Sequence, residues 1–155
     1  MNGNTAKAAT LSVPQLQEMN QAELDALFRN SPAGPIPNGE ADGIAIVAPD
    51  FEVSELAAKV INLLAWKGKV FDAASGQLRN RVSPFGINAV IADVYRGESW
   101  FDGKECIVLD YSKTSIVAHW VRDEIREVSP GLYLGIVFWE HDKLINFTLD
   151  FTPYE

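Results

Sequence analysis

The feature that most constrains this chain is a change of hydrophobic period near residue 69. Before it, apolar residues recur at helical spacing. After it, they alternate with polar residues at period two, which is typical of strands with one buried face. Short turn signals, such as Asp102-Gly103 and Ser129-Pro130-Gly131, divide this second part. We expect strands at 69–72, 77–82, 87–96, 104–111, 115–128, 132–139 and 144–152, preceded by a brief strand at 44–47.

Sequential hairpins of this kind leave open sheet edges unless the sheet closes, because an unpaired edge invites aggregation. We therefore predict a mainly β fold, an antiparallel meander that closes into a barrel after short N-terminal helices. A chain of 155 residues suits a single core, which we place at 12–155. The alternative is an α+β cystatin-like cone of the ketosteroid isomerase type, which also begins with helices and ends with long antiparallel strands.

Helix-start signals precede the sheet. Ser12 followed by Gln15, and Asn20 followed by Glu23, both have the capping-box spacing, and Ser54 offers another cap. They predict helices near 13–29 and 54–66, after a disordered tail at 1–11. The segment 31–43 holds three prolines and three glycines, which exclude regular structure. We expect it to lie across a surface or an opening.

Charge and cysteine content exclude several classes of function. A net charge of −8 without a basic run argues against binding nucleic acid or an anionic membrane. Cys106 is the one cysteine, so no internal disulfide forms, and we expect a buried thiol. The sequence shows neither a secretory leader pattern nor an apolar stretch long enough to span a membrane, which predicts a cytoplasmic location.

The central hairpin carries the main candidate site. If Ser129 and Pro130 form its tip, one face collects Val121 and Asp123, with His119, opposite Ile136 and Phe138. This face is apolar except for the His and the Asp, which suit general acid–base chemistry inside a cavity. Hydrogen-bonded core residues are the alternative reading of the pair.

The opposite face of the same hairpin carries Arg122, Glu124 and Arg126 beside aromatic residues. It is interpreted as a solvated outer face with ion pairs between strands. The rival interpretation makes this face the interior, with its arginines binding a carboxylate or phenolate. A slip of one residue at the tip would exchange the partners across the hairpin.

Further candidates lie on neighbouring strands. Lys69 shares a face with Phe71 if the strand begins at residue 69, and it would then point inward, where burial lowers the basicity of a lysine. An exposed lysine is the commoner alternative. Tyr111 ends a predicted strand, where its phenol could donate a proton. No phosphate-binding glycine loop is present and histidines are few, so we expect neither a cofactor nor a metal ion.

Two short stretches carry a resemblance to a known group. Trp66, Gly68, Lys69 and Phe71 in the first, and the run from Glu124 to Gly135 with Arg126 and Leu134 in the second, resemble small lipocalin-like bacterial proteins of the GXWXG type. The Gly-x-Trp-x-Gly motif itself does not occur here. The resemblance implies a calycin-like barrel with a central pocket and names no catalytic residue.

The sequence thus predicts a barrel that binds a small hydrophobic or aromatic molecule. Our hypothesis is a cofactor-independent isomerase, cyclase or lyase, with a non-catalytic lipocalin-like carrier as the alternative. The sequence does not decide whether the chain forms a homodimer through its sheet edges. The proposed catalytic residues are His119, Asp123 and Tyr111. The proposed ligand-binding residues are Lys69, Arg126, Trp66, Val121, Ile136 and Phe138.

Overall fold

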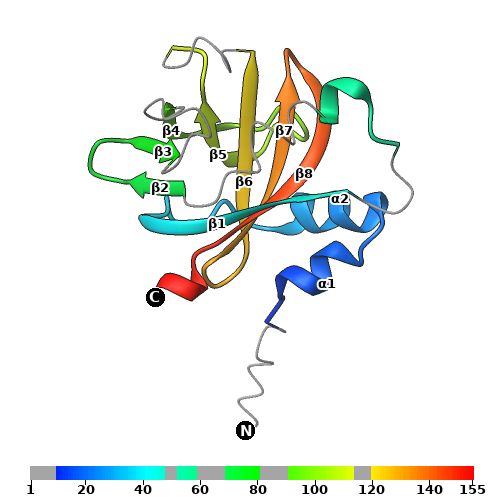
Figure 1. Ribbon diagram of the computed structural model, residues 1–155, viewed down its shortest axis with the longest axis horizontal. Coiled ribbons are helices and arrows are strands. Elements are labelled where there is room, and N and C mark those ends of the chain that lie inside the picture. The colour runs from blue at the N-terminus through cyan, green and yellow to red at the C-terminus, as the bar shows by residue number, and fades with distance from the viewer. Residues whose placement is uncertain (1–9, 48–51, 59–68, 81–90, 114–119) are drawn as a thin grey trace, which may run out of the picture.

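The computed structural model describes residues 10–47, 52–58, 69–80, 91–113 and 120–155 (Figure 1). Two short helices come first and strands follow to near the C-terminus. The elements are α1 (Val13–Gln17), α2 (Gln21–Asn30), β1 (Gly39–Ile46), β2 (Lys69–Asp72), β3 (Gln77–Asn80), β4 (Ile91–Glu98), β5 (Glu105–Asp110), β6 (Val121–Ser129), β7 (Leu132–Trp139), β8 (Asp142–Asp150) and a final turn of 3₁₀ helix, η1 (Thr152–Tyr154).

The eight described strands form a closed barrel in which every strand pairs antiparallel with its neighbours in the sequence. Closure comes from β1, which pairs with β2 through Gly39–Ala41 and with β8 through Asp42–Ile46. A mainly β barrel with short helices at its start is therefore confirmed. The cone alternative is wrong, because a cone keeps its sheet open.

The strand positions follow the predictions closely from β2 onward, and β7 and β2 match them residue for residue. The first strand differs. We predicted a brief strand at 44–47 and irregular chain before it, whereas β1 already begins at Gly39. The prediction was wrong because barrel closure gives residues 39–41 partners on β2 and residues 42–43 partners on β8, and local composition does not show such partners.

Both helices begin where the capping boxes predict. The Ser12 N–H donates to Gln15 Oε1, and Asn20 Oδ1 accepts from the Glu23 N–H at 2.8 Å. Their apolar side chains pack on the outside of the barrel wall, against the outer faces of β7 and β1. This outer cluster contains Leu16, Leu24, Phe28, Ile46, Leu132, Leu134, Ile136 and Phe138.

Two other predictions, the helix at 54–66 and the disordered tail at 1–11, lie only partly within the described residues. The Ser54 Oγ accepts from the Ala57 N–H at 3.0 Å, so a helical segment begins as predicted at 55–58, and its continuation lies outside the described residues. Residues 1–9 of the predicted tail also lie outside them. Leu11, at the end of that stretch, packs against the outer cluster, and its N–H donates to Ser129 Oγ.

The Pro/Gly-rich segment crosses one end of the barrel. Ala33 is buried in the interior cluster, and its carbonyl accepts from the Glu127 N–H near the end of β6. The Gly34 carbonyl accepts from Arg96 at the end of β4, and the Pro35 carbonyl from the Tyr133 hydroxyl at the start of β7. In an antiparallel barrel these three strand ends lie together, so 31–38 covers that end, as the sequence suggested.

The pairing predicted across the β6–β7 hairpin is wrong by one residue. A bulge between Glu127 and Ser129 puts Asp123 opposite Val137 and Glu124 opposite Ile136. A single extra residue in one strand exchanges which partner residues share a face. The interior face is therefore formed by Val121, Asp123 and Ile125 with Tyr133, Gly135 and Val137.

Candidate functional site

Three ionisable side chains come together inside the barrel: Asp123, Tyr111 and Lys69. Asp123 and Tyr111 are 0% exposed, and Lys69 is 2% exposed. The Tyr111 hydroxyl donates to Asp123 Oδ2 at 3.3 Å. Lys69 interacts through its charge with the Asp123 carboxylate. The residues around them are aliphatic and aromatic, so this polar cluster is surrounded by the apolar core.

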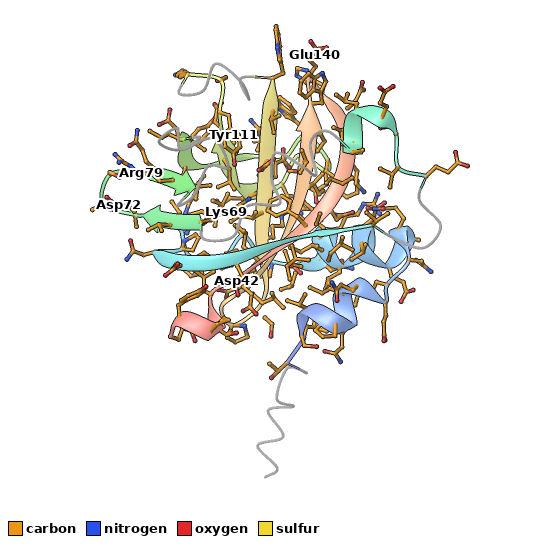
Figure 2. The ribbon with its side chains drawn as sticks, viewed as in Figure 1. Asp42, Lys69, Asp72, Arg79, Tyr111 and Glu140 are labelled. Carbon is orange, nitrogen blue, oxygen red and sulfur yellow. The ribbon has the colours of Figure 1, made fainter. Side chains whose placement is uncertain are left out.

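The topology brings the three residues to the same half of the barrel. Lys69 is the first residue of β2, Tyr111 follows the last residue of β5, and Asp123 is the third residue of β6. All three positions are near the end opposite to the one that 31–38 covers. In Figure 2, Lys69 and Tyr111 lie in the inner part of the molecule, whereas Asp72 and Arg79 lie at its periphery.

Burial dominates the electrostatics of this cluster. It raises the pKa of Asp123 to about 7, although the positive charge of Lys69 and the hydrogen bond from Tyr111 both act to lower it. Burial also lowers the pKa of Lys69, against the opposing effect of the Asp123 charge. The pKa of Tyr111 lies well above its ordinary value because of burial and the adjacent Asp123. At neutral pH, Asp123 can therefore both hold and release a proton.

One oxygen of this carboxyl group has no partner among the residues that the structure describes. Asp123 Oδ1 is buried and makes no hydrogen bond within the described part of the chain. A buried polar atom without a partner costs about 1–3 kcal/mol. Such exceptions in a native core need an explanation, and a bound molecule that pairs with the atom is one of them.

Of the remaining predicted site residues, Val121 faces the interior beside Asp123. Arg126, Ile136 and Phe138 do not. Arg126 pairs with Leu134 on the outer face of the sheet, and Ile136 and Phe138 belong to the outer cluster under the helices. Ile136 and Phe138 do not share a space with Asp123, because the bulge in the hairpin reverses the face predicted for the β7 residues. Arg126 lies on the outer face of β6, as the main interpretation predicts, but that face is covered there rather than solvated.

Arg126 binds protein groups outside the barrel. It is 1% exposed, and its guanidinium donates to both Asp102 carboxylate oxygens at 2.6 and 2.7 Å. It also donates to the Phe28 carbonyl at 2.9 Å and lies over the Phe28 ring. These contacts attach the 99–104 connection and the end of α2 to the barrel wall, which is a structural role for this arginine.

His119 and Trp66 lie outside the described residues, so their proposed roles stay predictions from the sequence. Cys106 is buried as expected, and burial raises the pKa of its thiol to about 12, which leaves it unreactive at neutral pH. In the described part of the chain, no group of three or more His, Cys, Asp and Glu side chains could hold a metal ion.

Sequence reasoning missed the glycines that shape the interior. A Cβ at Gly135 would lie 2.2 Å from the Phe147 ring, so this glycine makes room for that ring inside the barrel. A Cβ at Gly43 would lie 3.2 Å from Lys69 Cε. A glycine that interrupts a strand pattern is a signal of close approach, which Gly135 carries within the predicted strand at 132–139. Gly43 gives no such signal, because it lies in the segment predicted to be irregular.

Comparisons with known proteins bear on the fold. No family model matches the chain, and no curated protein matches it. Among solved structures it is similar to a protein from Thermomonospora curvata, with a TM-score of 0.57 and 17% identity over 86% of this chain and 88% of that one. The likeness shows the fold alone. Among the described residues, none of the helices has the length and apolar character that crossing a membrane requires.

Proposed function

We propose that the barrel binds a small hydrophobic or aromatic molecule and that Asp123 transfers a proton to and from it without a cofactor. The observation that carries this proposal is the buried Asp123 carboxyl, whose pKa is raised to about 7 and whose Oδ1 has no partner among the described residues. Strongly shifted acids in apolar surroundings are typical of functional sites. A core that served packing alone would be more stable with an apolar residue at this position.

The chemistry that fits is proton transfer at carbon in an isomerase, cyclase or lyase reaction. Asp123 acts as the general acid or base, since its pKa near 7 suits both directions of transfer. Tyr111 orients the carboxyl group by its hydrogen bond to Oδ2, which leaves Oδ1 for the substrate. Lys69 supplies a balancing positive charge. His119 remains our second candidate for acid–base work, on the strength of the sequence.

A solvent-exchange assay tests this proposal. The protein is incubated with acetophenone or phenylacetone in D₂O, and deuterium at the carbon beside the carbonyl is measured by mass spectrometry. We expect exchange above the uncatalysed rate in the wild type and its loss in Asp123→Asn. Asp142→Asn, the same chemical change at an exposed position on β8, is the matched control and should exchange like the wild type. Wild-type exchange in Asp123→Asn would reject Asp123 as the proton carrier.

The same assay extends to His119 and to the carrier alternative. His119→Ala should abolish exchange while its thermal midpoint stays within a few degrees of the wild type, and a fall in both would make His119 structural. The apolar lining of the interior favours a non-catalytic carrier as the second candidate. A carrier would be stabilised by the two ketones yet exchange no faster than Asp123→Asn.

A further inference from the structure

Lys69 has features that an acid–base role of Asp123 does not require. Its side chain is enclosed by the barrel and only 2% exposed. In most proteins a lysine side chain extends to solvent instead. On the neighbouring strand β1, Lys69 is paired with Ala41. The inner face of β1 continues with Gly43 and Ala45, which are also small residues. This stripe of small residues leaves the volume that the long lysine stem occupies.

The Gly43 position shows this most clearly. Its backbone is not among those with positive φ, so conformation does not require a glycine there. A Cβ at Gly43 would lie 3.2 Å from Lys69 Cε, so the lysine stem would have to shift by a few tenths of an ångström. The Lys69 Nζ lies 5.7 Å from the centre of the Phe147 ring, which Gly135 in turn accommodates. Two glycines thus fit the interior around Lys69 and the ring beside it.

Among the described residues, one acid acts on Lys69 through its charge. Asp123 is the acid whose charge raises the pKa of Lys69, and burial outweighs that effect. When Asp123 is protonated, Lys69 loses the charge that holds its own proton. An amine whose charged form is disfavoured by burial and that lies next to a proton donor has the properties of a nucleophilic lysine.

We propose that Lys69 captures an aldehyde or ketone as an imine inside the barrel. This inference rests on the part of the proposed function by which the barrel admits a small molecule. The amine lone pair attacks the carbonyl carbon, and the carbonyl oxygen takes a proton from the Asp123 carboxylic acid. Nitrogen then returns a proton to Asp123, which passes it to the hydroxyl group. Water leaves as the nitrogen lone pair forms the C=N bond, and the protonated imine remains beside the Asp123 carboxylate. One water is released, and nothing is oxidised or reduced.

A carboxylic acid ligand, which a buried lysine could also bind as an ion pair, fits less well. Asp123 already places one carboxyl group beside Lys69. A second carboxylate would meet it as a like charge in a region of low dielectric constant, which is unfavourable. A neutral carbonyl compound adds no charge, and its oxygen can accept a hydrogen bond from a protonated Asp123 Oδ1.

Reductive trapping tests the imine. The wild type is incubated at pH 7 with cinnamaldehyde, benzaldehyde or octanal and sodium cyanoborohydride, and adducts are located by peptide mass spectrometry. An ordinary exposed lysine, with a pKa near 10.4, is less than about 0.1% uncharged at this pH. We therefore expect the main lysine adduct at Lys69, exceeding that at the exposed Lys104 by at least about tenfold, while the α-amino group, with a pKa of about 8, is labelled separately.

Variants and a parallel assay separate the two proposals. Lys69→Met should lose the main adduct, and Lys104→Met, the matched control, should keep it. Labelling of Lys69 no greater than that of Lys104 with all three aldehydes in the wild type overturns the imine, whether or not the variant folds. If solvent exchange through Asp123 persists in that case, the proposed function stands without the imine. If Lys69 is labelled but exchange does not depend on Asp123, the imine stands and the proton transfer falls.

Discussion

Asp123 should make the stability of this protein fall as the pH rises from acid to neutral. Burial raises its folded-state pKa from an ordinary 3.8 to about 7. A carboxyl group with a raised pKa stabilises the fold while it is protonated, and this contribution is lost between the unfolded-state and folded-state pKa values. A difference of about 3 units corresponds to about 4 kcal/mol, lost mainly between pH 4 and pH 7.

The variant Asp123→Asn isolates this effect, because asparagine has a similar shape and does not ionise. Without Asp123, burial should lower the pKa of Lys69 further, and this changes the difference between the two proteins in the same direction. The free energy of unfolding of the wild type, measured by urea denaturation, should therefore fall by about 4 kcal/mol relative to the variant from pH 4 to pH 8. Parallel profiles, with a relative change below about 1 kcal/mol, would refute a buried acid with a raised pKa.

Two further predictions concern the residues that build the barrel around the site. Arg126→Met should lower the free energy of unfolding, measured by urea denaturation, by about 3–5 kcal/mol, because it leaves the Asp102 carboxylate without its partner. Arg96→Met, which removes the exposed pair with Glu105, should lower it by about 1 kcal/mol or less in the same titration. Gly135→Ala should lower the thermal midpoint by several degrees, since its Cβ meets the Phe147 ring and overpacking costs about 1–3 kcal/mol; an unchanged midpoint would show that this ring moves freely.

The sequence predicted the barrel because its period-two pattern is strong in the second half of the chain. The inward residues of β8, namely Ile145, Phe147 and Leu149, alternate with Asn146 and Thr148, and the structure places the two sets on opposite faces of the barrel wall. The capping boxes of α1 and α2 were equally clear, because each depends on two side chains three residues apart. Local patterns of this kind are readable without tertiary information.

Two features depended on tertiary structure and were predicted wrongly. The bulge between Glu127 and Ser129 has no unique signature beside a Ser-Pro-Gly turn, so the β7 residues were assigned to the wrong face. The early start of β1 requires β2 and β8 as partners, and the composition of residues 39–43 does not indicate that pairing. Among the site residues, Asp123, Tyr111 and Lys69 were each selected from the sequence, but their meeting across β2, β5 and β6 follows only from closure of the barrel.

The most direct test of the account is the titration of the Asp123 carboxyl group itself, followed by the ¹³C chemical shift of labelled aspartate. We predict a pKa of about 7 in the wild type. It should rise in both Tyr111→Phe and Lys69→Met, since the phenol hydrogen bond and the lysine charge each lower it. A wild-type pKa near the ordinary 3.8, unmoved by either variant, would contradict the buried cluster on which the proposed chemistry depends.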